Sequence, residues 1–421
     1  MLTLPPGPAT GRLGQTVTLA SDPLRALRAL RAEFGPVFTV RTTNGPMVVV
    51  GAAEELVRVT ELDPGSARAG EARRAVLPQA APRSVFGGDG EAHAAASARV
   101  HDALTPPAVA RLEPGIVAIA QRHAASWPSG RPFRLRVRLR DIADEVWVRL
   151  VLRPRDEART VALTRAVRHL LRTPGNPPVP PPGEGQGLLG PAMTRLLERR
   201  MARFADLVKA DIEERRTDGG AGGDGLLAQF AETDLAPEAV VEELLIVTAA
   251  ATEATASGLT SVIERLAHHP ELAVRLGQNG AADPLFGPVV DESLRLRPVA
   301  MAAMRRLTRP VTLAGHQLEP GTVLMAPSLL LHRDPTRYRD PDAFVPERFE
   351  GGPDGPFFPF GGGARACIGR HLAQTELALV VPAVLATRRL RPLAREPERL
   401  VERATILAPC RGALVTASAG G

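Results

Sequence analysis

A helical pattern extends over roughly 30 residues, from position 237 to 268. Apolar side chains recur every three or four residues between Leu244 and Leu266, which predicts one long helix. Pro237 suits the first turn of a helix, and the acidic residues that follow it favour the positive end of the helix dipole. At 1.5 Å per residue this helix is about 45 Å long. We therefore expect it to cross a whole domain.

The rest of the pattern predicts a mainly α fold with a small β region near both ends of the chain. The predicted helices cover residues 22–34, much of 108–172, a segment that ends at 216, residues 289–297 and a last helix that begins just after Cys367. The predicted strands are 37–40, 47–50, 311–313 and 322–325, and the last two are expected to form a hairpin around the Pro-Gly turn at 320–321.

Residues 173–187 read TPGNPPVPPPGEGQG and cannot form a regular helix or a paired strand. Proline fixes φ and has no N–H to donate, which excludes both structures. Two interpretations fit the segment equally well. It is either a linker between domains or a mobile loop over a site.

Composition excludes several classes of protein. The 421 residues are 44% hydrophobic, but no apolar run reaches the ~18 residues of a membrane span, and the first residues lack a secretion signal. The net charge is +6, yet the arginines are scattered among acids and only 4% of residues are aromatic, which argues against nucleic-acid binding. Two cysteines allow at most one disulfide, which favours a reducing cytoplasm.

The segment FGGGARACIG, residues 360–369, carries the strongest chemical signal. Its glycines allow a tight backbone turn that a flat ligand can approach closely. Cys367 stands before a predicted helix, where free N–H groups stabilise a thiolate. Arg365 can reach a carboxylate on the same ligand. The alternative is a buried structural cysteine after a glycine-rich turn, which is the usual state of a free cysteine.

The same segment matches F-x-x-G-x-R-x-C-x-G, the haem-ligand loop of the cytochrome P450 family, at every position. Glu292 and Arg295 match the family's E-x-x-R, and Arg348 lies in a P-E-R-F match. The order and spacing of these motifs make the whole chain similar to a soluble bacterial haem-thiolate monooxygenase.

This resemblance implies one cytochrome P450 domain over residues 1–421, with residues 173–190 as a mobile loop. Haem b would lie between the long helix and the cysteine loop, and Cys367 would bind the iron. The resemblance places six further residues around the haem: Phe360, Gly363, Gly369, His93, Arg305 and Arg365, of which the last three face its propionates. It implies a structural cluster of Glu292, Arg295 and Arg348. It also implies a substrate pocket that contains Ala250, Ala251, Val299 and Ala300.

Two departures from the family pattern stand out. Four residues after His93 the family has an arginine, but this chain has Ser97, so one propionate is expected to be held less firmly. In the oxygen-activating groove of the long helix, Glu253 supplies the usual acid, but Ala254 replaces the alcohol that follows it. Thr255 is next, about 100° further round the helix, and only a local bulge would bring it to the same place.

The resemblance implies an enzyme that inserts oxygen into a small organic molecule of the natural-product type, with electrons from a separate ferredoxin and ferredoxin reductase. Arg365, Arg370 and His371 are candidates for a basic docking face. Without the alcohol, protons are expected to come from water or from a hydroxyl group on the substrate. Two alternatives remain open: oxidative coupling or peroxide-driven chemistry, and a haem-binding protein without turnover.

Overall fold

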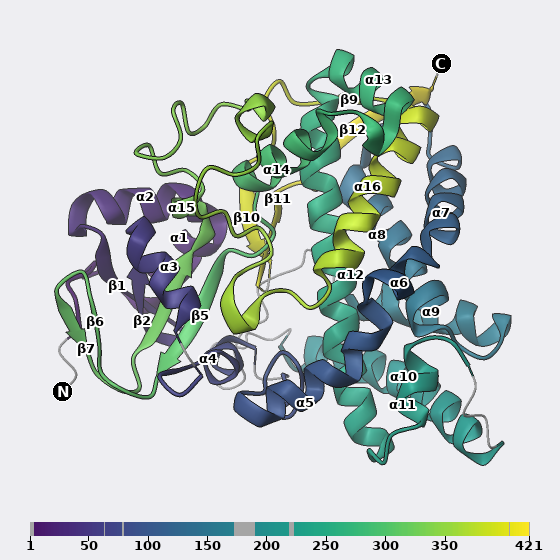
Figure 1. Cartoon of the computed structure of the whole chain (residues 1–421), viewed down its shortest axis with the longest axis horizontal. Helices are drawn as coiled ribbons and strands as arrows, with labels where there is room; N and C mark the ends of the chain where they lie inside the picture. Colours follow the sequence, from purple (N-terminus) through teal and green to yellow (C-terminus); the bar gives the residue numbers. More distant parts are fainter. Residues whose placement is uncertain are drawn as a thin grey trace.

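Helix α12 (Pro237–Ala267) runs through the middle of the molecule beside α16 (Arg370–Thr387) and packs against α8 (Leu135–Val146) (Figure 1). The computed structural model describes residues 4–62, 64–77, 80–171, 190–218, 223–403 and 405–420. α12 has the predicted length and continues as an α-helix without interruption. Most of its side chains are buried in its second half, as expected for a helix that is covered on several sides.

Helices make up most of the described chain. In addition to the three above, they are α1 (Arg12–Ser21), α2 (Pro23–Phe34), α3 (Ala53–Glu61), α4 (Ala69–Val76), α5 (Gly90–His101), α6 (Pro106–Ala110), α7 (Glu113–Ala125), α9 (Glu157–Leu171), α10 (Gly190–Thr217), α11 (Leu226–Ala231), α13 (Pro270–Asn279), α14 (Phe286–Leu296) and α15 (Ser328–Leu331). The helices from α5 to α13 gather on one side of the molecule (Figure 1).

The strands form small sheets, the largest of which lies on the opposite side, among the N-terminal helices (Figure 1). Its strand order is β1 (Val37–Thr42), β2 (Gly45–Val50), β8 (Val323–Pro327), β5 (Ala302–Leu307) and β3 (Ala67–Arg68). The smaller sheets consist of β4 (Phe133–Arg134), β12 (Leu414–Ala419) and β9 (Arg388–Pro392), of β6 (Val311–Leu313) with β7 (His316–Leu318), and of β10 (Leu400–Arg403) with β11 (Ile406–Pro409).

The predicted hairpin is wrong. β6 pairs with β7 across the turn at Ala314 and Gly315, both of which have positive φ. β8 instead enters the large sheet, antiparallel to β5 and parallel to β2. The reason is burial: residues 324–327 are all buried, and a continuous apolar run of this kind belongs in the middle of a sheet and not in an exposed hairpin.

Buried side chains separate into a large helical core and two smaller clusters that contain residues from the large sheet. The mainly α fold with a small β region is therefore confirmed. Within the described ranges, every helix is too short or too polar to cross a lipid bilayer. The proline-rich segment falls outside the described residues, apart from Gly190 at the start of α10.

Candidate active site

The cysteine loop closes on itself just before α16. The backbone N–H of Cys367 donates to the carbonyl oxygen of Phe360 at 2.9 Å, which joins the two ends of the loop. Gly363 has φ +61°, and a Cβ at this position would lie 2.5 Å from the carbonyl oxygen of Thr60 in α3. Only glycine therefore fits. α16 begins at Arg370, two residues later than the sequence predicts.

The thiol of Cys367 is free and can be reached by solvent, although protein atoms crowd it on several sides. Burial raises the pKa of Cys367, and this effect exceeds the opposing effects of the Gly369 N–H and of the positive charges on Arg370 and Arg73. The loop does bring N–H and guanidinium groups toward the sulfur, which is what an anionic ligand needs.

Three arginines and one histidine gather near this loop, around Asp89. Arg365 donates to Oδ1 of Asp89 at 2.8 Å and to the carbonyl oxygens of Val85 and Gly88. Arg305 is 3% exposed and donates to the carbonyl oxygen of Thr60 at 3.2 Å. Its neighbour Arg306 is half-buried, with a side chain 40% exposed, so Arg305 is the more deeply buried arginine of the two.

Burial and mutual repulsion shift the pKa values of this group. Burial, followed by the charges of Arg365 and Arg305, lowers the pKa of Arg73 to about 9. Burial and the same kind of repulsion, from Arg365 and Arg73, lower the pKa of His93 to about 4, so this imidazole is neutral at pH 7. Positive charge therefore exceeds negative charge here, which favours an anionic ligand.

In α12, consecutive side chains contact different neighbours. Glu253 forms ion pairs with Arg136 and with Arg140 of α8, the latter at 2.8 Å. Thr255 donates a hydrogen bond from Oγ1 to Oε2 of Glu376 in α16, at 3.0 Å. α12 contains no bulge at this point, so nothing brings the Thr255 hydroxyl to the place of the missing alcohol at Ala254.

Glu376 is buried, and its burial raises the pKa of its carboxyl group to about 8, although the hydrogen bond from Thr255 opposes this shift. The carboxyl group is therefore mostly protonated at pH 7. A neutral acid and a hydroxyl thus form one buried pair between α12 and α16.

The predicted pocket residues are small and apolar, and they lie on two elements. Ala250 is exposed and Ala251 half-buried on α12, while Val299 and Ala300 follow α14. The carbonyl oxygen of Val299 accepts a hydrogen bond from Leu407, and Ala300 pairs with Ile406, so strand β11 fixes this segment.

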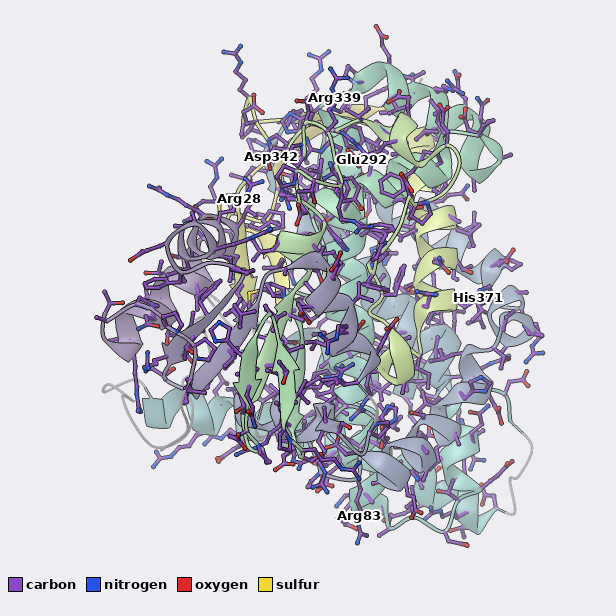
Figure 2. The ribbon with its side chains drawn as sticks, turned by 60° about the vertical axis from the view of Figure 1, so that its left-hand side comes forward. Arg28, Arg83, Glu292, Arg339, Asp342 and His371 are labelled. Carbon is purple, nitrogen blue, oxygen red and sulfur yellow. The ribbon has the colours of Figure 1, made fainter. Side chains whose placement is uncertain are left out.

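The structure brings the predicted structural cluster together. Glu292 and Arg295 are fully buried and form a two-pronged ion pair, with distances of 2.6 and 2.8 Å. Arg348, in the 3₁₀ turn Pro346–Phe349, donates to the same carboxylate at 3.2 Å. Figure 2 labels Glu292 among the side chains of this part of the molecule.

Comparison with known proteins identifies the fold and the chemistry together. The family model for cytochrome P450 matches residues 3–416. The chain belongs to the cytochrome P450 family. It is an oxidoreductase of the monooxygenase type, and membership of this family implies a haem-iron cofactor, a small-molecule substrate and a source of electrons.

Relatives agree along most of the chain. Putative cytochrome P450 135B1 of Mycobacterium tuberculosis is 29% identical, over 98% of this chain and 91% of the relative. Cyclooctat-9-en-7-ol 5-monooxygenase of Streptomyces melanosporofaciens is 30% identical, over 90% and 88%. The solved structure of the retinoic acid-bound cyanobacterial protein CYP120A1 has a TM-score of 0.82 at 20% identity, with 100% of both chains covered, which shows the shared fold.

The residues around Cys367 fit a haem. A single thiol stands beside a loop in which a Cβ at Gly363 would collide with α3, and arginines in excess of carboxylates lie nearby. The iron of a haem binds a thiolate ligand. Its two propionates form ion pairs with guanidinium groups.

Sequence reasoning missed several contributors. Arg73 of α4 and Asp89 carry no local motif, and only the folded chain brings them to Arg365. The same holds for Arg136 and Arg140, which stand more than a hundred residues before Glu253. Their signal lies in long-range charge pairing, which a single sequence does not reveal.

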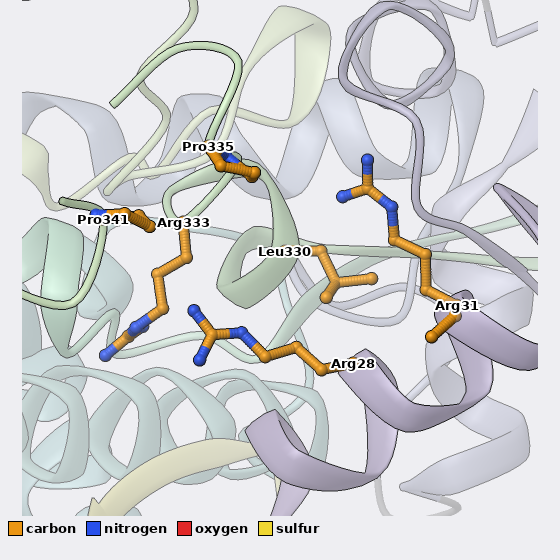
Figure 3. A pocket seen from close by; sticks show the side chains of 7 residues that line it. Arg28, Arg31, Leu330, Arg333, Pro335 and Pro341 are labelled. Atoms are coloured by element: carbon orange, nitrogen blue, oxygen red, sulfur yellow. The ribbon is translucent and has the colours of Figure 1, made fainter. Parts of the chain in front are cut away.

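A cavity of about 490 Å³ lies elsewhere, between α2 and the segment after α15 (Figure 3). Three arginines line it, but each already has an acidic partner. Arg28 and Arg333 share Asp342, and Arg31 pairs with Asp334. We therefore regard this cavity as part of an ion-pair network and not as the active site.

Proposed function

We propose that this cytochrome P450 is a haem b-dependent hydroxylase of a hydroxyl-bearing natural product, supplied with electrons by a ferredoxin and its reductase in the cytoplasm. The observation that carries the proposal is the cysteine loop beside an arginine cluster. Ala254 of α12, at the position of the family's usual alcohol, supports it. Cys367 would bind the iron, and Arg305, Arg365 and His93 would face the propionates.

When bound, the haem supplies the activation of O2, and a thiolate ligand favours cleavage of the O–O bond. The chain's part is to position the substrate and to hold protons near it. Ala254 cannot donate a proton, and Glu253 is engaged by Arg136 and Arg140. A hydroxyl on the substrate is the group that best fills this gap, because it would order a proton donor at the missing position.

The expected pocket residues and one relative support a substrate class. Ala250, Ala251, Val299 and Ala300 offer small apolar surfaces, which suit a hydrocarbon skeleton. The Streptomyces melanosporofaciens relative acts, by its name, on an alcohol, cyclooctat-9-en-7-ol, and oxidises its position 5. We infer a substrate of the same class for this chain: an apolar, terpene-like skeleton that already carries a hydroxyl group.

Electron supply requires a docking face near Cys367. Arg365 points inward to Asp89, so it does not contribute to that face. Arg370 is exposed and His371 half-buried at the start of α16, and Figure 2 labels His371 on this helix. These two residues are the remaining basic contacts for an acidic ferredoxin.

The assignment of the ligand is tested by the carbon monoxide complex of the reduced protein. Wild type and Cys410→Ser should show the red-shifted Soret band of thiolate-ligated haem, and Cys367→Ser should lose it. Cys410 is the matched control because it is the chain's other free cysteine. A normal band in Cys367→Ser would refute the assignment.

Turnover is tested separately. With a surrogate ferredoxin, its reductase and a terpene alcohol, hydroxylated product should form as reduced pyridine nucleotide is consumed. The buried Thr255–Glu376 pair gives an alternative some support, because a groove with no free alcohol suits oxidative coupling or peroxide-driven chemistry. Product formation with hydrogen peroxide but not with ferredoxin would favour that alternative. Haem binding with neither activity would indicate a haem-binding protein without turnover.

A further inference from the structure

The arginine cluster contains more positive charge than the nearby described residues neutralise. Arg73, Arg305 and Arg365 act on one another and share one carboxylate, that of Asp89. Asp89 is itself fully engaged. Its Oδ1 accepts from the Gly70 N–H at 2.7 Å and from Arg365 at 2.8 Å, and its Oδ2 accepts from the Glu71 N–H at 2.8 Å.

The three arginines differ in how firmly the protein holds them. Arg305 and Arg365 donate to main-chain carbonyl oxygens, and Arg365 also to Asp89. Within the described part of the chain, Arg73 makes a single hydrogen bond, to the carbonyl oxygen of Phe86 at 3.4 Å, and its guanidinium lies over the Phe86 ring at 4.5 Å. Most of its five donors therefore remain available for a ligand.

α5 lacks a cation at the position where the family pattern has an arginine. Ser97 stands there, and its Oγ lies 3.3 Å from Nε2 of His93, one turn earlier on the same helix. The serine adds no charge but can fix the orientation of the imidazole ring. α5 thus supplies an oriented histidine, while the missing positive charge has to come from another element.

We propose that Arg73 of α4 supplies this charge and pairs with one haem propionate, and that Ser97 is a positioning residue for His93. This rests on the proposed haem b assignment. The two propionates and Asp89 would together balance the three arginines. A planar guanidinium can also hold a carboxylate through two parallel hydrogen bonds, which a serine cannot do.

α4 is fixed firmly enough to serve as the support for this contact. Asp89 binds the first N–H groups of α4 and Arg365 at once, so it joins α4 to the cysteine loop. A Cβ at Gly70 would collide with the carbonyl oxygen of Gly87, and Arg74 donates to that same oxygen. The segment that contains Asp89 and the helix that carries Arg73 are therefore in direct contact.

The test measures haem binding and does not depend on turnover. Apoprotein is titrated with hemin through the Soret band, and haem release to apomyoglobin is timed. Arg73→Gln should weaken hemin binding about tenfold, the effect of losing one charge-assisted pair. Arg68→Gln removes the same charge immediately before the same helix, where the side chain is 54% exposed, and should remain within about twofold of wild type, by the same scale.

Two further experiments exclude an effect on folding alone. In hemin dimethyl ester both propionates are neutral esters, so wild type and Arg73→Gln should bind it equally. Ser97→Arg gives up the contact of Ser97 with His93 but adds a guanidinium to α5. It should therefore raise the hemin affinity of Arg73→Gln but not that of wild type, in which Arg73 already makes the pair.

Equal hemin binding by Arg73→Gln and wild type would overturn the proposal, as would a difference that persists with the dimethyl ester. A large gain from Ser97→Arg in wild type would also overturn it, because one propionate would then be unpaired in the native protein. If wild type binds hemin without a thiolate-type carbon monoxide band, the proposed function fails instead, so the two failures are distinguishable.

Discussion

Three consecutive residues of α12 differ in which neighbour their side chains contact and in whether they can supply a proton. Glu253 turns to α8 and Thr255 to α16, about 200° apart round the helix at ~100° per residue. Ala254 lies between them without a polar atom. The sequence predicts the missing alcohol directly, but it does not show that both neighbours are already engaged. Those partners are more than a hundred residues away in the chain.

Ala254→Thr tests whether a substrate hydroxyl replaces this alcohol. With the native substrate, coupling, measured as product per reduced nucleotide consumed, should be high in wild type. With an analogue that lacks the hydroxyl it should fall, and Ala254→Thr should restore part of it. The added volume is expected to weaken binding by ~1–3 kcal/mol if the groove is tight. Equal coupling in all four combinations of enzyme and substrate would show that position 254 plays no part in proton supply.

Glu376→Gln tests the buried acid. Its pKa in the folded protein, about 8, lies above the 4.5 of a free glutamate, so its stabilising contribution is present at low pH and lost as pH rises from about 4.5 to 8. Glutamine keeps an acceptor for Thr255 but does not titrate. Relative to wild type, Glu376→Gln should therefore gain stability across this window, by up to ~1.4 kcal/mol per pH unit, and level off above it. Urea unfolding at a series of pH values measures this, and a constant difference would contradict it.

At the scale of elements, Arg295 joins α14 to a long irregular segment. Besides Glu292, it donates to the carbonyl oxygens of His332, Pro341 and Ala343. The E-x-x-R spacing predicts the ion pair, because residues three apart share a face of a helix. The three carbonyl contacts could not be predicted, since loop backbone has no periodic pattern that would reveal its neighbours.

Glu292→Ala should be severely destabilising. It leaves Arg295 charged, buried and without its carboxylate, at a cost of ~3–5 kcal/mol. That is a large part of the ~5–15 kcal/mol typical of a folded protein, so we expect mostly insoluble or haem-free protein. Glu347→Ala, an exposed glutamate beside Arg348, is the control and should express normally. The yield of soluble, haem-loaded protein is the measurement, and wild-type yield from Glu292→Ala would contradict the prediction.

Helices and strands were predicted correctly where the periodicity of apolar residues agrees with their burial. The prediction failed where a local turn signal competes with burial. α12, α2 and strands β1 and β2 follow from their patterns within a few residues. β8 did not, because the nearby Pro-Gly turn suggested a local hairpin while its buried side chains required a central position in a sheet. Competition of this kind is settled by tertiary contacts, which act over hundreds of residues.

At the scale of the whole molecule, the N-terminal helices depend on ion pairs to distant segments. Arg28 and Arg31 of α2 reach Asp342 and Asp334, and Arg333 shares Asp342 with Arg28. The family motifs predict the overall fold and the position of Cys367, but not these pairs. Arginines are scattered throughout this chain, and one sequence gives no reason to match any of them with a particular acid.

The two partners of Asp342 should respond very differently to mutation, because their burial differs. The Arg28 side chain is 39% exposed, so its ion pair is worth only ~0–1 kcal/mol, and Arg28→Gln should behave much like the exposed Arg25→Gln. The Arg333 side chain is only 9% exposed, and burial lowers its pKa to about 9.

Asp342→Asn removes the only carboxylate that pairs with Arg333 in the described residues, and the Arg333 guanidinium also faces the charge of Arg28. We therefore expect Asp342→Asn to cost ~1–3 kcal/mol, clearly more than Arg28→Gln. The double variant Asp342→Asn with Arg28→Gln should recover part of this loss, since it removes the repulsion. Thermal and urea unfolding of the four proteins measure these differences. Equal losses for Asp342→Asn and Arg28→Gln would mean that Arg333 needs no counter-ion, and that the network does not secure α2 to the rest of the molecule.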